Sequence, residues 1–121
     1  MSEREKAAAF LLDVVACKVE EAYRQYVTDD FVHHNQYFKS DRQSLLDGMI
    51  ESNEKFPNKK LTIHKVIAEL PFVVVHAHVW LSEGMEASLI HIFRFADGRI
   101  AEMWEASQMI DKNMINEKGV F

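Results

Sequence analysis

The sequence predicts an α+β fold, with helices in the first half of the chain and consecutive antiparallel strands in the second. Apolar residues recur at steps of three and four in the first half, which is the spacing of one helix face. From Leu61 onward the period changes to two, as in half-buried strands. Asp97-Gly98 separates two of these alternating runs and is a strong hairpin signal. Helices followed by such strands are typical of an α+β domain.

The composition indicates one small globular domain over residues 1–121. With 14 Lys+Arg and 19 Asp+Glu the formal net charge is −5, and no basic cluster favours a nucleic-acid partner. No stretch of 18 apolar residues predicts a membrane span, and the charged start does not resemble a signal peptide. The single Cys17 cannot form an intrachain disulfide, which favours a reducing, cytoplasmic location.

The first 26 residues are predicted to be helical, because apolar side chains follow one stripe through them. Asp29-Asp30 and residues 33–36 interrupt this pattern and predict a loop. A second helix should begin near Ser40, where residues 40–43 have the form of a capping box, and end before Pro57.

Four strands are expected in the second half, over residues 61–68, 72–81, 85–95 and 99–109. Asp97-Gly98 and, more weakly, Glu83-Gly84 fit two-residue hairpin turns. Residues 111–121 are too polar to assign.

These turns would fix the register of the last three strands. They predict that His76 lies opposite His91 and that His91 lies opposite Trp104. The same face would carry His78, Leu89, Phe93, Glu102 and Ala106. The other face would be uniformly apolar, with Val73, Val75, Ala77, Val79, Ile90, Ile92, Ala101 and Met103.

Three histidines and a glutamate on one sheet face require partners, since an unpaired buried polar group costs about 1–3 kcal/mol. Neighbouring apolar and aromatic side chains argue against full exposure. We therefore expect a partly apolar pocket with a few convergent polar groups, the usual form of a small-molecule site. Its leading residues are His76 and His91.

Several segments resemble the SnoaL-like polyketide cyclase group of the nuclear-transport-factor-2-like superfamily. They are residues 26–35, residues 64–76, Ile90-His91-Ile92-Phe93-Arg94-Phe95 with the following Asp97-Gly98-Arg99-Ile100, Glu102-Met103-Trp104-Glu105, and residues 116–121. The resemblance implies helices packed in the concave side of a strongly curved, mainly antiparallel mixed sheet, with a pocket inside. It also implies a homodimer through the outer sheet face.

Characterised cyclases of this group close rings by an aldol reaction without metal or organic cofactor, using an aspartate as general acid/base. This chain has His91 at the aspartate position and Glu105 where an aspartate follows Trp104. His34 and Asn35 match the family's His-Asn pair, and His76 matches a histidine common in the strand.

Our first hypothesis is a cofactor-independent enzyme for a small apolar carbonyl compound, with His91 or His76 as base and the other histidine stabilising the enolate. His34, Asn35, His78, Leu89, Phe93, Glu102 and Trp104 would complete the pocket. A non-catalytic binding or dimerisation module, with the aspartate replaced by His91, is the second hypothesis. The third is a metal-dependent hydrolase or lyase that uses His76, His78 and His91, although no metal-binding motif supports it.

Overall fold

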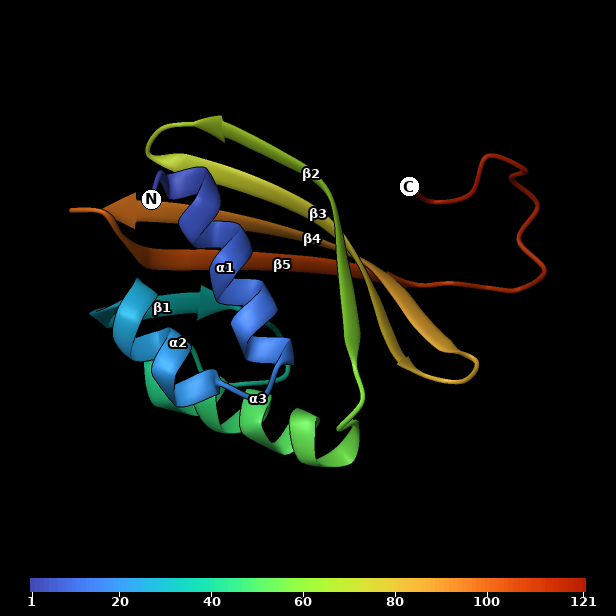
Figure 1. Ribbon diagram of the computed structural model, residues 1–121, viewed down its shortest axis with the longest axis horizontal. Coiled ribbons are helices and arrows are strands. Elements are labelled where there is room, and N and C mark those ends of the chain that lie inside the picture. The colour runs from blue at the N-terminus through green and yellow to red at the C-terminus, as the bar shows by residue number, and fades with distance from the viewer.

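The computed structural model describes residues 1–121 and confirms the α+β fold, with three helices and one five-stranded sheet. The helices lie on one side of a strongly curved sheet (Figure 1). In chain order the elements are α1 (Glu3–Val15), α2 (Val19–Tyr26), β1 (Val27–His34), α3 (Arg42–Lys55), β2 (Lys60–Glu69), β3 (Phe72–Ser82), β4 (Met85–Ala96) and β5 (Arg99–Met109).

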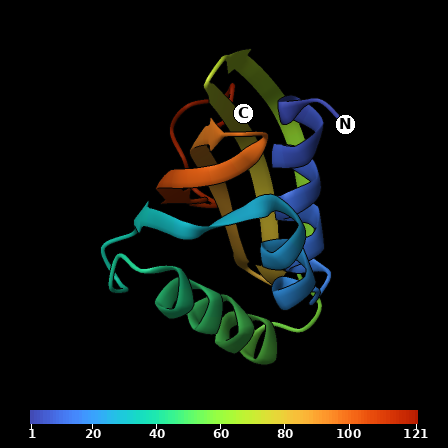
Figure 2. The same ribbon diagram turned by 90° about the vertical axis from the view of Figure 1, so that its left-hand side faces the viewer.

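The sheet is mixed, with the strand order β1-β5-β4-β3-β2. Strands β2 to β5 form an antiparallel meander, and β1 pairs with β5 in the parallel direction. We call the sheet face that meets the helices the inner face and the opposite one the outer face. Seen from its end, the sheet separates the helices from the C-terminal segment, which lies against the outer face (Figure 2).

The predicted N-terminal helical region is two helices. Ser2 caps α1 and forms a reciprocal capping box with Glu5. Cys17 has a φ of 65° and ends the first helix, so the chain turns before α2 begins at Val19.

Strand β1 corrects the predicted loop at residues 29–36. Phe31 and His33 are buried, whereas Asp29 and Asp30 are exposed, so part of the segment does alternate. Its register with β5 shifts between Val27 and Val32, and its partner is about 70 residues away in sequence. Local periodicity therefore gave no signal for this strand.

Helix α3 begins one residue later than the sequence suggested. Its N-cap is Asp41, whose side chain accepts a hydrogen bond from the Ser44 backbone, and it ends at Lys55, before Pro57.

Both predicted hairpin turns are confirmed. Ser82 pairs with Met85 and Ala96 pairs with Arg99, so each turn has two residues. Gly84 and Gly98 have φ values of 78° and 77°, a region that favours glycine.

The register predicted beyond these turns is wrong, because each hairpin contains a bulge close to its turn. Leu81 is the extra residue in β3 and Ala101 is the extra residue in β5. His91 therefore lies between Val75 and Glu105, and not between His76 and Trp104.

One bulge shifts β4 relative to β3, and the other shifts β4 relative to β5. As a result, the side chains of β4 lie on the faces opposite to those predicted, whereas those of β3 and β5 keep their predicted relation to each other. His91, Leu89 and Phe93 join the valines of β3 on the inner face. Ile90 and Ile92, predicted for the uniformly apolar face, lie half-exposed on the outer face.

The core fills the space between the helices and the inner face. Phe10 of α1 is fully buried and contacts Tyr23 and Phe93, with ring centroids 5.5 and 6.1 Å away. Phe31 packs edge-on against Tyr23, which joins β1 to the same cluster. None of the helices combines the length and the apolar character needed to cross a membrane.

Replacing Phe10 by alanine should lower the free energy of unfolding by about 3–5 kcal/mol, because it leaves a cavity beside the rings of Tyr23 and Phe93. Phe10→Leu should cost less. Urea unfolding followed by circular dichroism measures both changes. Leu12→Ala, at a 43% exposed position of the same helix, is the control and should change stability by less than about 1 kcal/mol. Equal losses at positions 10 and 12 would contradict this core.

Candidate functional site

A cavity of about 310 Å³ lies between the inner face of the sheet and helices α1 and α3. Twelve of the 19 residues that line it are hydrophobic. The lining residues are Leu11, Val14 and Val15 of α1, Asn35 and Phe38 of the β1–α3 loop, Leu45, Gly48, Met49 and Ser52 of α3, Lys59, Leu61 of β2, Val79 and Leu81 of β3, Ala87, Leu89 and His91 of β4, and Glu105, Ser107 and Met109 of β5.

Close packing between the loop and α3 shapes one wall of this cavity. The Phe38 ring lies directly against Gly48, in the space that a Cβ atom at position 48 would occupy. The absence of a side chain at Gly48 therefore lets the aromatic ring approach the helix.

His91 is the most deeply buried ionisable group of the cavity. It is 4% exposed, stacks on Phe93 at 5.8 Å, and its Nδ1 has no hydrogen-bond partner. Burial lowers the pKa of His91 below its ordinary value of 6.5, while the neighbouring Glu105 carboxylate opposes the shift. The imidazole is therefore largely neutral at neutral pH and free to accept a proton.

Glu105 lies across the strand pair from His91, with its Oε2 4.0 Å from His91 Nε2. This is too long for a direct hydrogen bond. The Asn35 side chain holds the same carboxylate oxygen through an Nδ2–H bond of 3.0 Å. The carboxylate is thus fixed in position beside the imidazole.

Asn35 is itself held by the loop that precedes α3. Its Oδ1 accepts a bond from the Tyr37 backbone, and its backbone N–H donates to Nδ1 of His33 at 3.2 Å. Since Nδ1 of His33 accepts, its Nε2 carries the hydrogen and donates to the Lys39 carbonyl at 2.6 Å. The buried His33 therefore fixes the shape of this loop and, through it, the orientation of Asn35 toward Glu105.

Lys59 is the only cationic residue among those that line the cavity. Its Nζ donates to Ser52 Oγ at 2.6 Å and to Asn53 Oδ1 at 3.0 Å, and no carboxylate pairs with it. Burial lowers the pKa of Lys59 from its ordinary value.

Of the residues expected at the site, His91, Asn35 and Leu89 line the cavity. Phe93 shares their face but is fully buried beneath His91. The remaining five lie on the outer face, in two separate clusters.

The first outer cluster joins three residues that we expected in the pocket. The His34 ring stacks on Trp104 at 4.9 Å, and its Nε2 lies 2.7 Å from Glu102 Oε2. Arg94 Nε donates to the other carboxylate oxygen at 3.0 Å. The hydrogen bonds from His34 and Arg94 lower the pKa of Glu102. This carboxylate is therefore paired on the surface and does not face the cavity.

The second outer cluster contains His76 and His78. Their rings and that of His64 surround Phe121 of the C-terminal segment, with centroids 4.5 to 5.5 Å from it. His76 Nε2 lies 2.9 Å from Ser88 Oγ. Because His76 and His91 occupy opposite faces, the structure does not bring them together as a catalytic pair.

The same separation bears on the three-histidine metal hypothesis. His76 and His78 point away from His91, so the three imidazoles do not converge. The structure contains no group of three or more histidine, cysteine, aspartate or glutamate residues arranged to hold a metal ion.

Sequence reasoning missed three polar residues on which the geometry of this site depends. Glu105 was noted only through the resemblance, and the predicted register placed its neighbour Trp104 beside His91. His33 gave no signal because its role depends on a strand that local periodicity did not predict. Lys59 sits just outside the predicted strand, and its sequence neighbourhood carries no motif.

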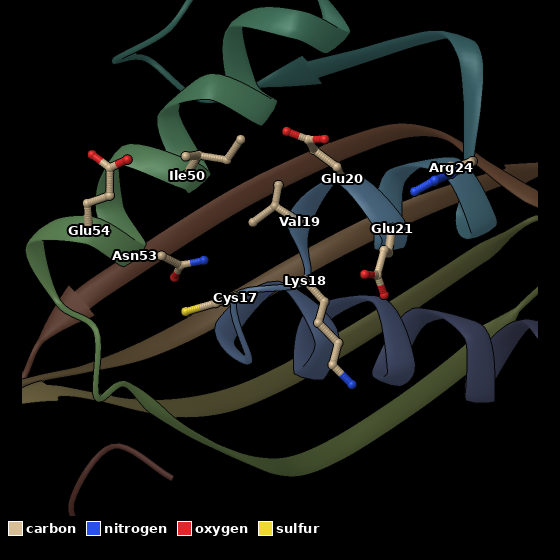
Figure 3. Close-up of a pocket in the computed structure, with 9 residues that line it drawn as sticks. All are labelled: Cys17, Lys18, Val19, Glu20, Glu21, Arg24, Ile50, Asn53 and Glu54. Carbon is tan, nitrogen blue, oxygen red and sulfur yellow. The ribbon is translucent and has the colours of Figure 1, made fainter.

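A second, open depression lies on the surface between the α1–α2 turn and α3 (Figure 3). It measures about 440 Å³ and is rich in charged side chains of both signs, among them Lys18, Glu21 and Arg24. Asn53 lines it and donates to the Val14 carbonyl, while its Oδ1 accepts from Lys59. Asn53 thus lies between this depression and Lys59 of the first cavity.

The three helices packed against the concave face of the five-stranded sheet define a cone-shaped α+β fold. Residues 8–103 match the family model of the SnoaL-like domain, and the chain belongs to this family. The resemblance inferred from the sequence is therefore confirmed. A search of curated proteins finds no match to this chain.

Solved structures show the same architecture. A SnoaL-like polyketide cyclase from Agrobacterium tumefaciens is 10% identical, with a TM-score of 0.74, covering 89% of this chain and 92% of that one. A cystatin-fold protein from Novosphingobium aromaticivorans is 19% identical, with a TM-score of 0.73 and coverage of 88% and 98%. An NTF2-like protein from Cytophaga hutchinsonii is 12% identical, with a TM-score of 0.73 and coverage of 89% and 91%. At these identities the likeness establishes the fold.

The buried His91 should make stability depend on pH below 6.5. The unfolded chain binds a proton there that the folded state resists, so the free energy of unfolding should fall as pH falls from 6.5 through the lowered folded pKa. His91→Gln should remove part of this fall, at most about 1.4 kcal/mol per pH unit. Urea unfolding at several pH values between 8 and 5 tests it.

The control for this measurement is Leu12→Ala, at the exposed position of α1, which removes no titratable group. It should keep the wild-type pH dependence. A His91→Gln curve parallel to that of the wild type would show that His91 is not held neutral by burial.

Proposed function

We propose that this protein is a cofactor-independent enzyme that binds a small, mainly apolar carbonyl compound and performs general acid/base chemistry of the aldol cyclase or isomerase type. His91 is the proposed base, and Glu105 is the charged partner that stabilises its protonated form.

One observation supports this proposal above the others. A buried, neutral imidazole faces a largely apolar cavity, and a carboxylate held by Asn35 lies 4.0 Å from it without pairing directly. A histidine kept only for structure would normally have both ring nitrogens hydrogen-bonded. Apolar walls around a few convergent polar groups are also typical of small-molecule sites.

In the proposed reaction, Nε2 of His91 removes a proton from the carbon next to the carbonyl of the ligand. This requires the tautomer with hydrogen on Nδ1. The C–H electron pair becomes the enolate, and Glu105 stabilises the imidazolium through its negative charge. The enolate carbon then attacks a second carbonyl carbon of the same ligand, forming a C–C bond. The resulting alkoxide takes the proton back from His91, so atoms and charge balance.

Proton abstraction can be tested without the natural substrate, by following deuterium incorporation into β-tetralone by NMR. The wild type should accelerate exchange at the carbon next to the ketone. His91→Ala should reduce that acceleration by about a hundredfold or more. His64→Ala, on the outer face, is the matched control and should exchange at the wild-type rate. Equal rates in wild type and His91→Ala would overturn the proposed role of His91.

A non-catalytic binding module is the alternative, and the same experiment separates it. In that case β-tetralone would bind without faster exchange, and His91→Asp would be the first form to show activity. That outcome would mean that the natural chain does not use this chemistry.

We also infer that the outer face pairs with a second copy of the chain. Phe72, Ile90 and Ile92 lie on adjacent strands of this face and remain 36–44% exposed. Exposed apolar groups of this size, gathered on one face and flanked by polar residues, are typical of protein interfaces.

Light scattering coupled to size-exclusion chromatography should therefore give the mass of a dimer. Ile92→Glu should shift it to a monomer with an unchanged circular dichroism spectrum, because the charge would be buried between the two sheets. Leu12→Glu, at an exposed position of α1, should remain dimeric. A monomeric wild type would contradict the inference.

A further inference from the structure

Resting on the proposed function, we propose that the ligand is an elongated keto acid, whose carboxylate pairs with Lys59 at one end of the cavity while its carbonyl lies at His91 and Glu105 at the other.

Lys59 places one positive charge in the cavity lining that no neighbouring carboxylate pairs. Lys59 donates to two neutral oxygens, those of Ser52 and Asn53, and keeps a third N–H without a partner in the structure. No other cation lines the cavity, and no carboxylate balances this one. A partly buried ammonium in apolar surroundings is stabilised most by an anion that enters with the ligand.

The register of β4 and β5 gives the length of the cavity. Its floor consists of three successive cross-strand pairs, His91–Glu105, Leu89–Ser107 and Ala87–Met109. Four residues of a strand span about 13 Å. Across the sheet, Ala87 pairs with Val79, and Val79 pairs with Leu61, so Lys59 lies at or beyond the Ala87 end.

The part of helix α3 that lines the cavity gives a second estimate of the cavity's length. Its cavity-lining residues run from Leu45, near the loop that carries Asn35, to Ser52, which binds Lys59. Seven residues of an α-helix rise about 10 Å. The proton-transfer pair and the ammonium are therefore separated by about the length of a medium-chain ligand, with only the hydroxyl of Ser107 on the floor between them.

A carboxylate fits this end better than a phosphate. One ammonium supplies a single positive charge, whereas a phosphate group carries nearly two negative charges and three acceptor oxygens. Glu105 is about 13 Å from the Lys59 end and so repels a bound carboxylate only weakly.

The probes are a ten-carbon straight-chain keto acid, with its ketone next to the terminal methyl group, and the methyl ester of that acid. Isothermal titration calorimetry at pH 7 should show the wild type binding the acid at least about tenfold more tightly than the ester. Lys59→Met and Lys59→Gln should each lose this preference and bind the acid no more tightly than the ester. Thermal unfolding of the ligand-free variants confirms that they are folded, and Gln keeps a donor toward Ser52 and Asn53.

Lys60→Met is the matched control. Lys60 is the adjacent lysine, is exposed, and packs over the Trp80 ring on the outer side of the sheet. This variant should keep the wild-type preference for the acid. Lys59→Arg should also keep it, because the positive charge remains.

The two proposals fail in different ways. His91→Ala should keep the preference for the acid and lose deuterium exchange, so absent exchange with an intact preference would overturn only the catalytic role. Equal binding of acid and ester by the wild type, or an intact preference in Lys59→Met and Lys59→Gln, would overturn the carboxylate site. Lys59 would then serve only to satisfy the C-terminal turn of α3.

Discussion

Two β-bulges, one on each side of the central strand β4, determine which side chains of this protein enter its cavity. Side chains alternate between the faces of a sheet, so a single extra residue exchanges the faces of everything beyond it. Leu81, the extra residue of β3, shifts the register between β3 and β4. Ala101, the extra residue of β5, shifts the register between β4 and β5. Together they turn His91 inward and Ile92 outward, while the strands on either side keep their relation to each other. The pairing of His91 with Glu105 depends on these two residues.

This arrangement explains which parts of the fold could be predicted from the sequence. The turns Glu83-Gly84 and Asp97-Gly98 have local chemistry that specifies them, and both were correct. His76 and Trp104 were correctly placed on one face, since the two shifts cancel between β3 and β5. Bulges have no comparable local signal here, so the face of His91 could not be derived. Strand β1 depends on a parallel partner far along the chain and was missed for a related reason.

The candidate site combines residues of two paired strands with a loop whose conformation is fixed by a buried histidine. His91 stands on the central strand β4, between paired residues of β3 and β5, and Glu105 is its partner on β5. Asn35 comes from a loop, but His33 bonds to that loop at two points and is buried beneath it. Preorganised groups of this kind lose little free energy to reorientation when charge develops during a reaction. The second charged residue, Lys59, lies in the connection between α3 and β2 and is held by side chains near the end of α3.

The contact between Phe38 and Gly48 has a further consequence for ligand size. Both residues line the cavity, yet neither belongs to the sheet that carries His91 and Glu105. A methyl group at position 48 would displace the aromatic ring and change the width of the cavity, leaving the strands and their bulges as they are. The width of the cavity and the proposed proton transfer therefore depend on separate elements. A substitution at this one helical position would therefore change the space available to a ligand without moving the strands that carry His91 and Glu105.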